Sequence, residues 1–581
     1  MRKLILFAIG LLVLSLSFAS AQPAIRTDNG VLNASSYQAD IARGSWFVIF
    51  GTGLGPANIS IYSGALPFPT SLSQTSVTVT PAAGGSAISC KLWYTLSTQI
   101  AALLPSSVTA GDYDVKVTYN NVTSGAYRIK VVERNFGYAT ASQNGAGVPQ
   151  ATNASLNGGI SLVRFTNGSI SFNNRTWPYR PAYPGETLVL WGTGLGADSQ
   201  SDENGGASGD MTSAGNVSVI VGGVGITPAY AGRSSGAPGL DQINFTLPAN
   251  VALGCNTSIQ VLAGGRYSNL GTLPTAKSGD QFCQHPFLTQ DQLKTLDSGG
   301  SVIIGGFALT KSTTSLSIPG LGSFDTTSES VGGSFSKYTS DTLTSVGGIS
   351  VAQIGSCYAT HLRGTTDQAL QGVVNSAADA GTPLLLNGPN ASNKAIPRGT
   401  GNSYSLSLYS SGVGGIGASG SPTLAGGTYT LSGPGGVDIG AFSNAQVPFP
   451  AAFKWENQNN ISTITRNQSL LIQWSGGGTE PGATVNIIGM SGSQVAGTPQ
   501  NPIYDIGLFV CTAAANLNTF TVPGSVTNYL SPVAAGSTTA IGLLSVGAGN
   551  SQPFTAPIVA GGSAPGQFSY AWIYSKNVAV Q

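Results

Sequence analysis

Charged side chains are scarce in this sequence. Lys and Arg together number 24 and Asp and Glu 23, so 8% of the 581 residues are charged, whereas an ordinary soluble domain carries about a quarter. No basic run follows the first few residues, so the chain lacks the electrostatic footprint that nucleic acids or anionic membranes require. With 41% apolar residues and 80 glycines, it is also a poor candidate for charge-driven disorder. The composition predicts a folded, near-neutral protein, but it does not indicate which reaction, if any, the protein catalyses.

Histidine is rarer still, because His285 and His361 are the only two in the sequence. A catalytic zinc site held by three histidines is therefore excluded. A mixed zinc site could use Cys283-x-His285 with Cys357-x3-His361, but neither pair has the cysteine spacing of a structural zinc site. A Ser-His-acid hydrolase would need His361 as its base, and we interpret His361 instead as a structural residue. We assign no catalytic residue.

Cysteine is sparse, and its count is odd. Five cysteines occur, at positions 90, 255, 283, 357 and 511. In an oxidising compartment such cysteines form lasting disulfides. We predict the bridges Cys255–Cys283 and Cys357–Cys511, and a buried free thiol at Cys90.

The first twenty-one residues have the pattern of a signal peptide. Arg2 and Lys3 precede an apolar run from residue 4 to residue 14, and the small triplet Ala19-Ser20-Ala21 stands before Gln22. The run is too short to span a membrane comfortably. We expect a Sec-type signal peptide over residues 1–21, a mature chain from Gln22, and a secreted or extracellular protein that does not insert into membranes after cleavage.

The first half of the chain repeats itself. Residues 43–55, which end in Gly-Thr-Gly-Leu-Gly, recur as residues 184–196, and residues 99–105 match residues 242–248. Within each unit apolar and polar residues alternate, as in residues 113–119, which is the period of a half-buried strand. Short strands between Gly, Pro and Asn clusters predict antiparallel sandwiches. We predict two Ig-like sandwiches over residues 22–134 and 135–275.

The second half has a different composition. Residues 276–300 are predicted to be a linker with one short helix, Thr289 to Leu296, capped by Thr289. Residues 301–581 are rich in Gly, Ser and Thr, yet they keep strand-like alternation. This region is predicted to be one large sandwich or jelly roll, or two smaller sandwiches with a boundary near residues 445–451. The predicted fold class is all-β throughout.

Two motifs suggest ligands. Gly192 to Ala197 fits the dinucleotide-binding string G-x-G-x-x-(G/A), but a loop sequence follows instead of a helix, so we interpret its glycines as a tight turn with positive φ. That loop gathers four acids beside Gly205, Gly206 and Gly209, which makes calcium the only cofactor candidate. The alternative interpretation is a solvated acidic loop. The four candidate ligands are Asp198, Asp202, Glu203 and Asp210.

A pair of carboxylates could serve glycoside hydrolysis. Asp438 and Glu456 flank a stretch in which Phe453 and Trp455 could stack on a sugar. Aromatic residues at alternate positions of a strand are, however, more typical of a core.

Several blocks in residues 28–275 resemble a known family. They are residues 31–37, 50–55, 191–196, 230–232 and 239–244. They are similar to the uncharacterised Solibacter-type C-terminal domain of secreted acidobacterial proteins, itself similar to the Ig-like IPT/TIG fold. The resemblance implies an extracellular β-sandwich without catalytic residues to transfer. The family's module ordinarily ends a protein, whereas some 280 residues follow it here.

The sequence therefore favours a secreted, non-enzymatic, multi-domain β protein, acting as an adhesion, matrix or glycan-binding module. Its expected partners are extracellular glycans or surface proteins. The alternative is a secreted polysaccharide-active enzyme with its site in residues 301–581.

Overall fold

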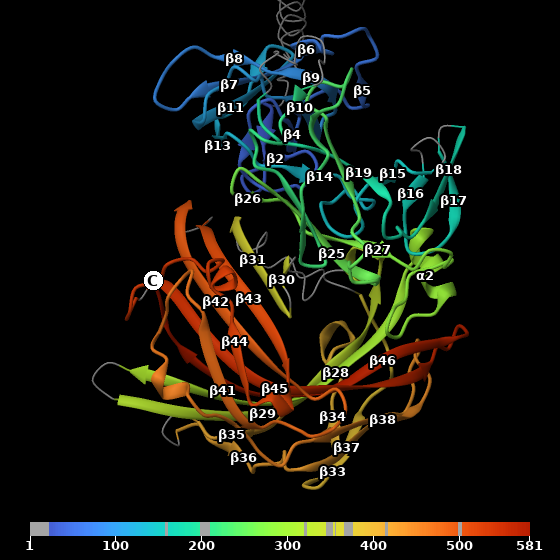
Figure 1. Cartoon of the computed structure of the whole chain (residues 1–581), viewed down its shortest axis with the longest axis vertical. Helices are drawn as coiled ribbons and strands as arrows, with labels where there is room; N and C mark the ends of the chain where they lie inside the picture. Colours follow the sequence, from blue (N-terminus) through green and yellow to red (C-terminus); the bar gives the residue numbers. More distant parts are fainter. Residues whose placement is uncertain are drawn as a thin grey trace, which may run out of the picture. The chain divides into compact units, whose positions relative to one another are not determined.

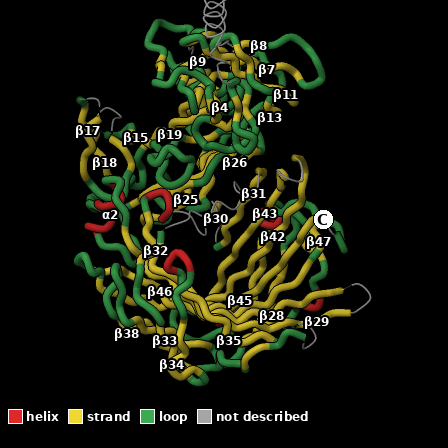
Figure 2. The backbone as a smooth tube through the Cα atoms, turned by 180° about the vertical axis from the view of Figure 1, so that it is seen from behind, coloured by secondary structure: helices red, strands yellow, loops and turns green. Residues whose placement is uncertain are grey.

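The structure is a computed structural model, which describes residues 22–156, 161–172, 174–197, 209–318, 322–343, 352–354, 356–364, 376–412, 416–497, 502–537 and 539–581. The predicted signal peptide, residues 1–21, lies outside them. Strands dominate the described chain, and its helices are short (Figures 1 and 2). The predicted all-β fold class is confirmed. Contacts divide the chain into two compact units, of which the first comprises Met1–Phe136, Thr193–Met211 and Gly232–Asp241 and the second the remainder.

Two sheets form the first sandwich. One has the order β1-β4-β10-β9-β5 with β2 also on β4; the other has the order β3-β13-β11-β7-β6 with β12 on β11 and β8 on β7. Their bounds are β1 Ala24–Ile25, β2 Val31–Asn33, β3 Ile41–Ala42, β4 Trp46–Thr52, β5 Ser60–Ile61, β6 Ser71–Leu72, β7 Thr75–Pro81, β8 Ile88–Ser89, β9 Lys91–Thr95, β10 Gln99–Leu103, β11 Gly111–Tyr119, β12 Val122–Thr123 and β13 Tyr127–Val132.

The pairing order is that of an immunoglobulin domain. In chain order β2, β4, β7, β9, β10, β11 and β13 take the places of strands A to G, because one sheet reads A-B-E-D and the other G-F-C. Alternate residues of both sheets meet in one buried cluster, to which Phe47 and Ile49 of β4 and Val115 and Val117 of β11 belong. This is the inward half of the alternation seen in the sequence.

The second repeat has the same pairing order. Strands β15, β19, β24 and β23 follow A-B-E-D, and β27, β25 and β21 follow G-F-C. Phe50 in β4 and Trp191 in β19 thus occupy equivalent strands. The bounds are β14 Gly137–Tyr138, β15 Ala151–Asn153, β16 Ser161–Val163, β17 Gly168–Phe172, β18 Arg175–Arg180, β19 Thr187–Thr193, β20 Gly209–Asp210, β21 Ser218–Val221, β22 Val224–Ile226, β23 Tyr230–Arg233, β24 Asp241–Thr246, β25 Gly254–Ala263, β26 Arg266–Tyr267 and β27 Gly271–Thr275.

A short helix follows this repeat. Helix α2, Gln290–Asp297, begins after Thr289, whose side chain accepts from the Gln292 amide while Gln292 reaches back to the Thr289 amide. This capping box confirms the predicted N-terminus. Leu293 and Leu296 are buried. The described residues contain two further short α-helices that the sequence analysis did not predict, α3 Ser340–Leu343 and α5 Gly524–Thr527.

The C-terminal region is built on an eleven-stranded sheet of the order β30-β31-β43-β42-β45-β46-β28-β29-β35-β36, with β32 on β29. Figure 1 shows its long strands β28, β29, β45 and β46. Its bounds are β28 Val302–Ile318, β29 Gly322–Tyr338, β30 Ala352–Ile354, β31 Cys357–Gly364, β32 Ala377–Ala378, β35 Tyr404–Ser410, β36 Ser419–Gly420, β42 Thr484–Gly497, β43 Pro502–Ala514, β45 Ala540–Pro557 and β46 Ser563–Asn577.

Smaller sheets complete this region around one hydrophobic cluster that runs from Phe307 to Val580. The residues proposed as a boundary, 445–451, include part of β38 and lie within that cluster's span. The small-sheet strands are β33 Leu384–Gly388, β34 Ala391–Ile396, β37 Gly427–Gly433, β38 Phe442–Phe449, β39 Phe453–Trp455, β40 Thr463–Ile464, β41 Leu470–Gly476, β44 Thr519–Val522 and β47 Ala579–Val580, and three 3-10 turns lie at Thr400–Asn402, Gln458–Asn460 and Ala515–Leu517.

Both predicted disulfides are present, Cys255–Cys283 and Cys357–Cys511, and Cys90 is a buried free thiol as predicted. Cys357 and Cys511 stand directly opposite each other in the antiparallel pair β31 and β43. Among the described helices, none has the length and hydrophobicity that crossing a lipid bilayer requires.

Candidate functional site

A β-bulge in strand β9 turns a tryptophan outward. On the partner strand β10, Ala101 pairs with Tyr94 and Ala102 pairs with Leu92, so Trp93 is an extra residue without a partner in the ladder. A bulge of this kind re-aims side chains. Leu92 and Thr95 are buried, whereas the two residues between them face outward, Trp93 with 48% of its surface exposed.

Trp93 belongs to a continuous row of five aromatic rings. Phe68 lies 5.2 Å from Trp46 in an edge-on arrangement and 5.8 Å from Tyr62. Trp93 lies 6.0 Å from Trp46 and 5.7 Å from Tyr94, between ring centroids. These separations are those of favourable aromatic pairs. We call Trp46, Tyr62, Phe68, Trp93 and Tyr94 the aromatic face.

Hydrogen bonds hold the phenols of this row. Gln99 donates from Nε2 to the Tyr94 hydroxyl at 2.7 Å, and Tyr62 donates its hydroxyl proton to Ala65 O at 2.6 Å. Burial, together with Tyr37, raises the pKa of Tyr94 to about 12. The Tyr94 hydroxyl therefore keeps its proton at physiological pH and, since it accepts from Gln99, can donate that proton to a ligand.

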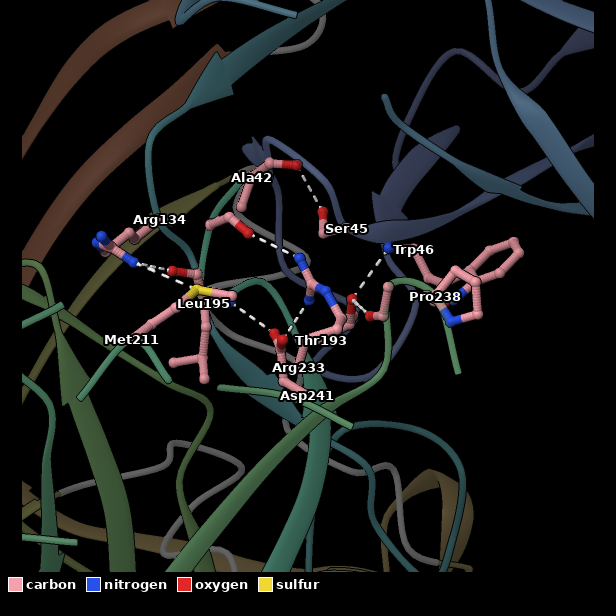
Figure 3. Close-up of polar contacts among 12 residues, drawn as sticks. Ala42, Ser45, Trp46, Arg134, Thr193, Leu195, Met211, Arg233, Pro238 and Asp241 are labelled. Carbon is pink, nitrogen blue, oxygen red and sulfur yellow. Dashed lines mark hydrogen bonds and ion pairs between the residues drawn. The ribbon is translucent and has the colours of Figure 1, made fainter. Parts of the chain in front are cut away.

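Trp46 is the buried ring at the middle of the row, and hydrogen bonds fix it there. Its indole Nε1 donates to Pro238 O at 2.8 Å, and its backbone N–H donates to Thr193 Oγ1 at 2.9 Å (Figure 3). Thr193 in turn donates to Gly239 O at 2.7 Å. Gly239 has φ +72°, and a Cβ there would stand 2.7 Å from Trp46 Nε1. Only glycine fits this turn without displacing the indole.

A buried ion pair anchors the second Gly-Thr-Gly-Leu-Gly turn. Arg233 and Asp241 form a salt bridge, and both side chains are fully buried. Asp241 Oδ2 accepts from Leu195 N at 2.7 Å, and Arg233 Nη2 donates to Gly196 O at 2.8 Å (Figure 3). We call Arg233 and Asp241, with the turn they hold, the turn clasp.

The clasp confirms that the glycine motif is a turn. Gly194 and Gly196 have φ values of +110° and +114°, as expected for positive-φ glycines. No helix opens from β19 onward within the described stretch that ends at residue 197, so the dinucleotide-binding geometry is absent there. The motif serves the packing of the first unit.

A second string resembles a catalytic motif. Gly232-Arg233-Ser234-Ser235-Gly236 fits the nucleophile-elbow pattern G-x-S-x-G. A true elbow lies between a strand and a helix, whereas this one joins β23 to β24, with Ser234 N donating to Leu240 O at 2.9 Å. Its arginine belongs to the turn clasp. The sequence analysis missed this string, and the structure gives it a structural role.

The predicted calcium ligands fall mostly outside the described residues. Asp198, Asp202 and Glu203 lie there, and Asp210 is an exposed residue of β20. Among the residues that the structure describes, no three His, Cys, Asp or Glu side chains gather as metal ligands. The calcium site stays a prediction.

The two carboxylates considered for glycoside hydrolysis have separate partners. Asp438 Oδ2 accepts from Asp379 N at 2.8 Å. Glu456 pairs with Lys454 at 2.6 Å and accepts from Ser475, and these hydrogen bonds lower its pKa. Phe453 and Trp455 are 3% and 2% exposed, so both rings belong to the core, as the alternative interpretation held. Neither ring is open for a sugar to stack on.

His285 is a structural residue. Its Nδ1 accepts from the backbone amides of Phe287 and Leu288 at 3.4 and 3.2 Å, and Nε2 lies 3.4 Å from Asn256 Nδ2. Burial lowers its pKa to about 4. The neutral ring is therefore a hydrogen-bond acceptor. The side chain of His361 lies outside the described residues.

Comparisons with known proteins found similar solved structures and no matching family for this chain. No family model and no curated protein matches it. The chain is similar to several solved structures.

Domains 5-6 of the S-layer protein SbsC match at 12% identity over 44% of this chain and 99% of that one, with a TM-score of 0.14. The FN1-FN3 domains of chicken CNTN1 match at 9% over 74% and 98%, with a TM-score of 0.12, and the BSP domain of a biofilm associated protein matches at 9% over 96% and 98%, with a TM-score of 0.12. Likenesses this low establish neither fold nor function, so both rest on the chain's own geometry.

Proposed function

We propose that this protein is a non-enzymatic, extracellular adhesion module that binds polysaccharide through the aromatic face. One observation carries the proposal. A β-bulge places Trp93 outward on a sheet, as the exposed ring of a row of five, between Trp46 and Tyr94. Trp93 is exposed, and Tyr62, Phe68 and Tyr94 beside it are partly exposed, so the row presents several aromatic rings to a ligand.

Sugar rings suit such a surface. A pyranose has a face of C–H groups that packs on an aromatic ring, while its hydroxyls point sideways to polar groups. The Tyr94 hydroxyl at one end of the row supplies a polar group of this kind. Trp46 lies on β4, and Trp93 and Tyr94 lie on β9; both strands pair with β10 in one sheet. These three rings therefore need little ordering when a chain binds.

The extracellular part of the proposal is supported by the cysteines. The chain has two disulfides, which form and persist in oxidising compartments, and residues 1–21 have a signal-peptide pattern. Membership of the Solibacter-type family remains part of the same proposal. Within the part of residues 301–581 that the structure describes, the candidate carboxylate Glu456 is paired with Lys454 and the neighbouring aromatic rings are in the core, which does not favour the enzyme alternative.

The test is a glycan array probed with the mature chain, followed by affinity electrophoresis with each polysaccharide that binds. Trp93→Ala should weaken binding at least tenfold, because it removes the exposed ring of the row. Tyr119→Ala is the matched control, since Tyr119 is a half-buried aromatic residue on the opposite sheet of the same sandwich. It should leave binding unchanged.

Two results would contradict the proposal. One is the absence of any glycan ligand on the array, together with capture of a protein by the aromatic face. The other is glycan binding that Trp93→Ala and Tyr119→Ala affect equally. Circular dichroism of both variants would show that each keeps its β structure.

A further inference from the structure

A polar groove crosses the C-terminal sheet over strands β42, β45 and β46. Its volume is about 520 Å³, within the usual range for small-ligand sites. Most of its lining side chains are amides and hydroxyls, and none of the described lining residues is charged. Six polar residues line it: Thr484, Asn486, Asn550, Ser551, Gln552 and Ser569.

Strand alternation places the lining residues on both sides of the sheet. Val485, Ala548 and Phe568 are buried in the core of this region. Their neighbours along each strand point to the opposite face, among them Thr484, which stands directly opposite Gly549. The remaining lining residues of β45 and β46 alternate onto the core-facing side, and they are Asn550, Gln552 and Tyr570.

Three hydroxyl groups in the groove already donate their protons to acceptors within the chain. Thr484 donates to Gly549 O at 3.3 Å, Ser551 to Gln567 Oε1 at 2.7 Å, and Ser569 to Phe307 O at 3.1 Å. Each oxygen keeps lone pairs that can accept from a ligand. Asn486 Oδ1 accepts from Thr512 at 2.8 Å, which leaves its NH2 group as a donor. The NH2 groups of Asn550 and Gln552 each use one proton, toward Pro481 O at 3.3 Å and Asn550 Oδ1 at 3.4 Å, and each keeps a second proton to donate. The groove thus offers both hydrogen-bond acceptors and hydrogen-bond donors.

We propose that this groove is a second binding site, which takes a neutral saccharide chain through hydrogen bonds with its hydroxyls. A saccharide residue offers several O–H donors, whereas a peptide offers one N–H donor per residue and brings side chains that need apolar pockets. The lining offers no exposed ring, because Tyr570 is 2% exposed and donates its hydroxyl proton to Gly477 O at 2.9 Å. The absence of charge in the lining matches a neutral ligand. The site is independent of the aromatic face.

The test uses the whole mature chain carrying Trp93→Ala, so that the aromatic face is silenced. Saturation-transfer NMR is recorded with cellohexaose, xylohexaose and mannohexaose, and with an anionic hexagalacturonate. We expect saturable binding of at least one neutral hexasaccharide and none of the anionic one. Adding Asn486→Ala and Ser551→Ala should weaken that binding at least tenfold, because one donor and one acceptor are lost.

Asn444→Ala is the control, an exposed amide on β38 outside the groove. It should not change binding, and unfolding curves should show that all variants fold. The inference is overturned if no neutral hexasaccharide binds at millimolar concentration, if the double replacement leaves binding intact, or if only the anion binds. The proposed function is decided separately, by Trp93→Ala in the otherwise native chain.

Discussion

Complete burial decides what Arg233 and Asp241 contribute to the first unit. Both side chains have 0% exposure, so removing one leaves the other as an uncompensated buried charge. Asp241→Ala would also leave the Leu195 amide without its acceptor. We expect Asp241→Ala to lower the free energy of unfolding of this unit by about 3–5 kcal/mol, measured by urea unfolding followed through the fluorescence of Trp46 and Trp93.

The matched control is Asp114→Ala. Asp114 pairs with Arg128 on the surface of the same sandwich, at 2.7 Å. An exposed pair contributes about 1 kcal/mol or less. Equal losses from the two replacements would contradict the role given to the turn clasp.

His285 makes stability depend on pH. Its pKa is about 4 in the folded chain and about 6.5 in the unfolded chain. Between these values the unfolded chain binds more protons, so the free energy of unfolding falls as the pH falls from about 6.5 to about 4. Protonation at Nδ1 would also break the two backbone hydrogen bonds that this atom accepts.

NMR of the chain with labelled histidine checks this directly, because only two histidines contribute signals. His285 should remain neutral down to about pH 4, and His285→Gln should flatten the stability profile in the same window. A titration midpoint near 6.5 for both histidines would show that the environment of His285 has been misjudged.

At the residue scale, the features that could be predicted from the sequence are those that depend on residue spacing or composition. The disulfide partners and the positive-φ glycines were predicted correctly. Trp93 was missed because a bulge depends on how β9 pairs with β10, and the local pattern does not show it. Arg233 was missed because its partner Asp241 lies on another strand, and a lone arginine gives no signal. The G-x-S-x-G string around it was likewise overlooked.

At the scale of elements, α2 depends on its first turn. Thr289 accepts from the Gln292 amide at 3.3 Å, and Gln292 Oε1 accepts from the Thr289 amide at 3.0 Å. Replacing an N-cap threonine by alanine costs about 1 kcal/mol. We expect Thr289→Ala to speed hydrogen exchange of the α2 amides about fivefold, whereas Lys294→Ala, an exposed replacement in the same helix, should not. Equal exchange rates in the two variants would mean that packing of Leu293 and Leu296 alone holds the helix.

Some strands could be predicted from the alternation of apolar and polar residues, and others could not. The alternation of residues 113–119 predicted β11, whose burial pattern follows it. Strand β9 breaks the alternation at its bulge, and short strands such as β5 carry too few residues to show a period. Helix α3 was missed because four residues give no helical stripe.

At the scale of the whole molecule, the two disulfides close loops of very different length. The sequence separation is 154 residues for Cys357–Cys511 and 28 for Cys255–Cys283. In the chain-entropy treatment these loops correspond to about 5 and about 3.5 kcal/mol. We therefore expect Cys357→Ser with Cys511→Ser to lower the unfolding temperature more than Cys255→Ser with Cys283→Ser, as measured by calorimetry. The reverse order would show that local packing outweighs loop length.

Long-range strand pairing explains why the sequence could not show whether the C-terminal region is one domain or two. Strand β28 pairs in parallel with β46, so Gly305 stands beside Gly566, and no local pattern encodes a partner so distant. The repeat in residues 43–55 and 184–196, by contrast, could be recognised because the two segments share identical residues. The same pairing order in both repeats supports that interpretation.

The central claim is that Trp93 touches the polysaccharide, and indole NMR tests it most directly. The chain has seven tryptophans, each giving one indole N–H signal in a sample labelled with nitrogen-15 at tryptophan. Titration with a polysaccharide fragment that binds should shift the Trp93 signal strongly. It should shift the Trp46 signal little, because that indole N–H is bonded to Pro238 O. The signals of Trp455 and Trp474, both buried in the C-terminal core, should stay in place. Saturable binding that leaves the Trp93 signal unmoved would contradict the account.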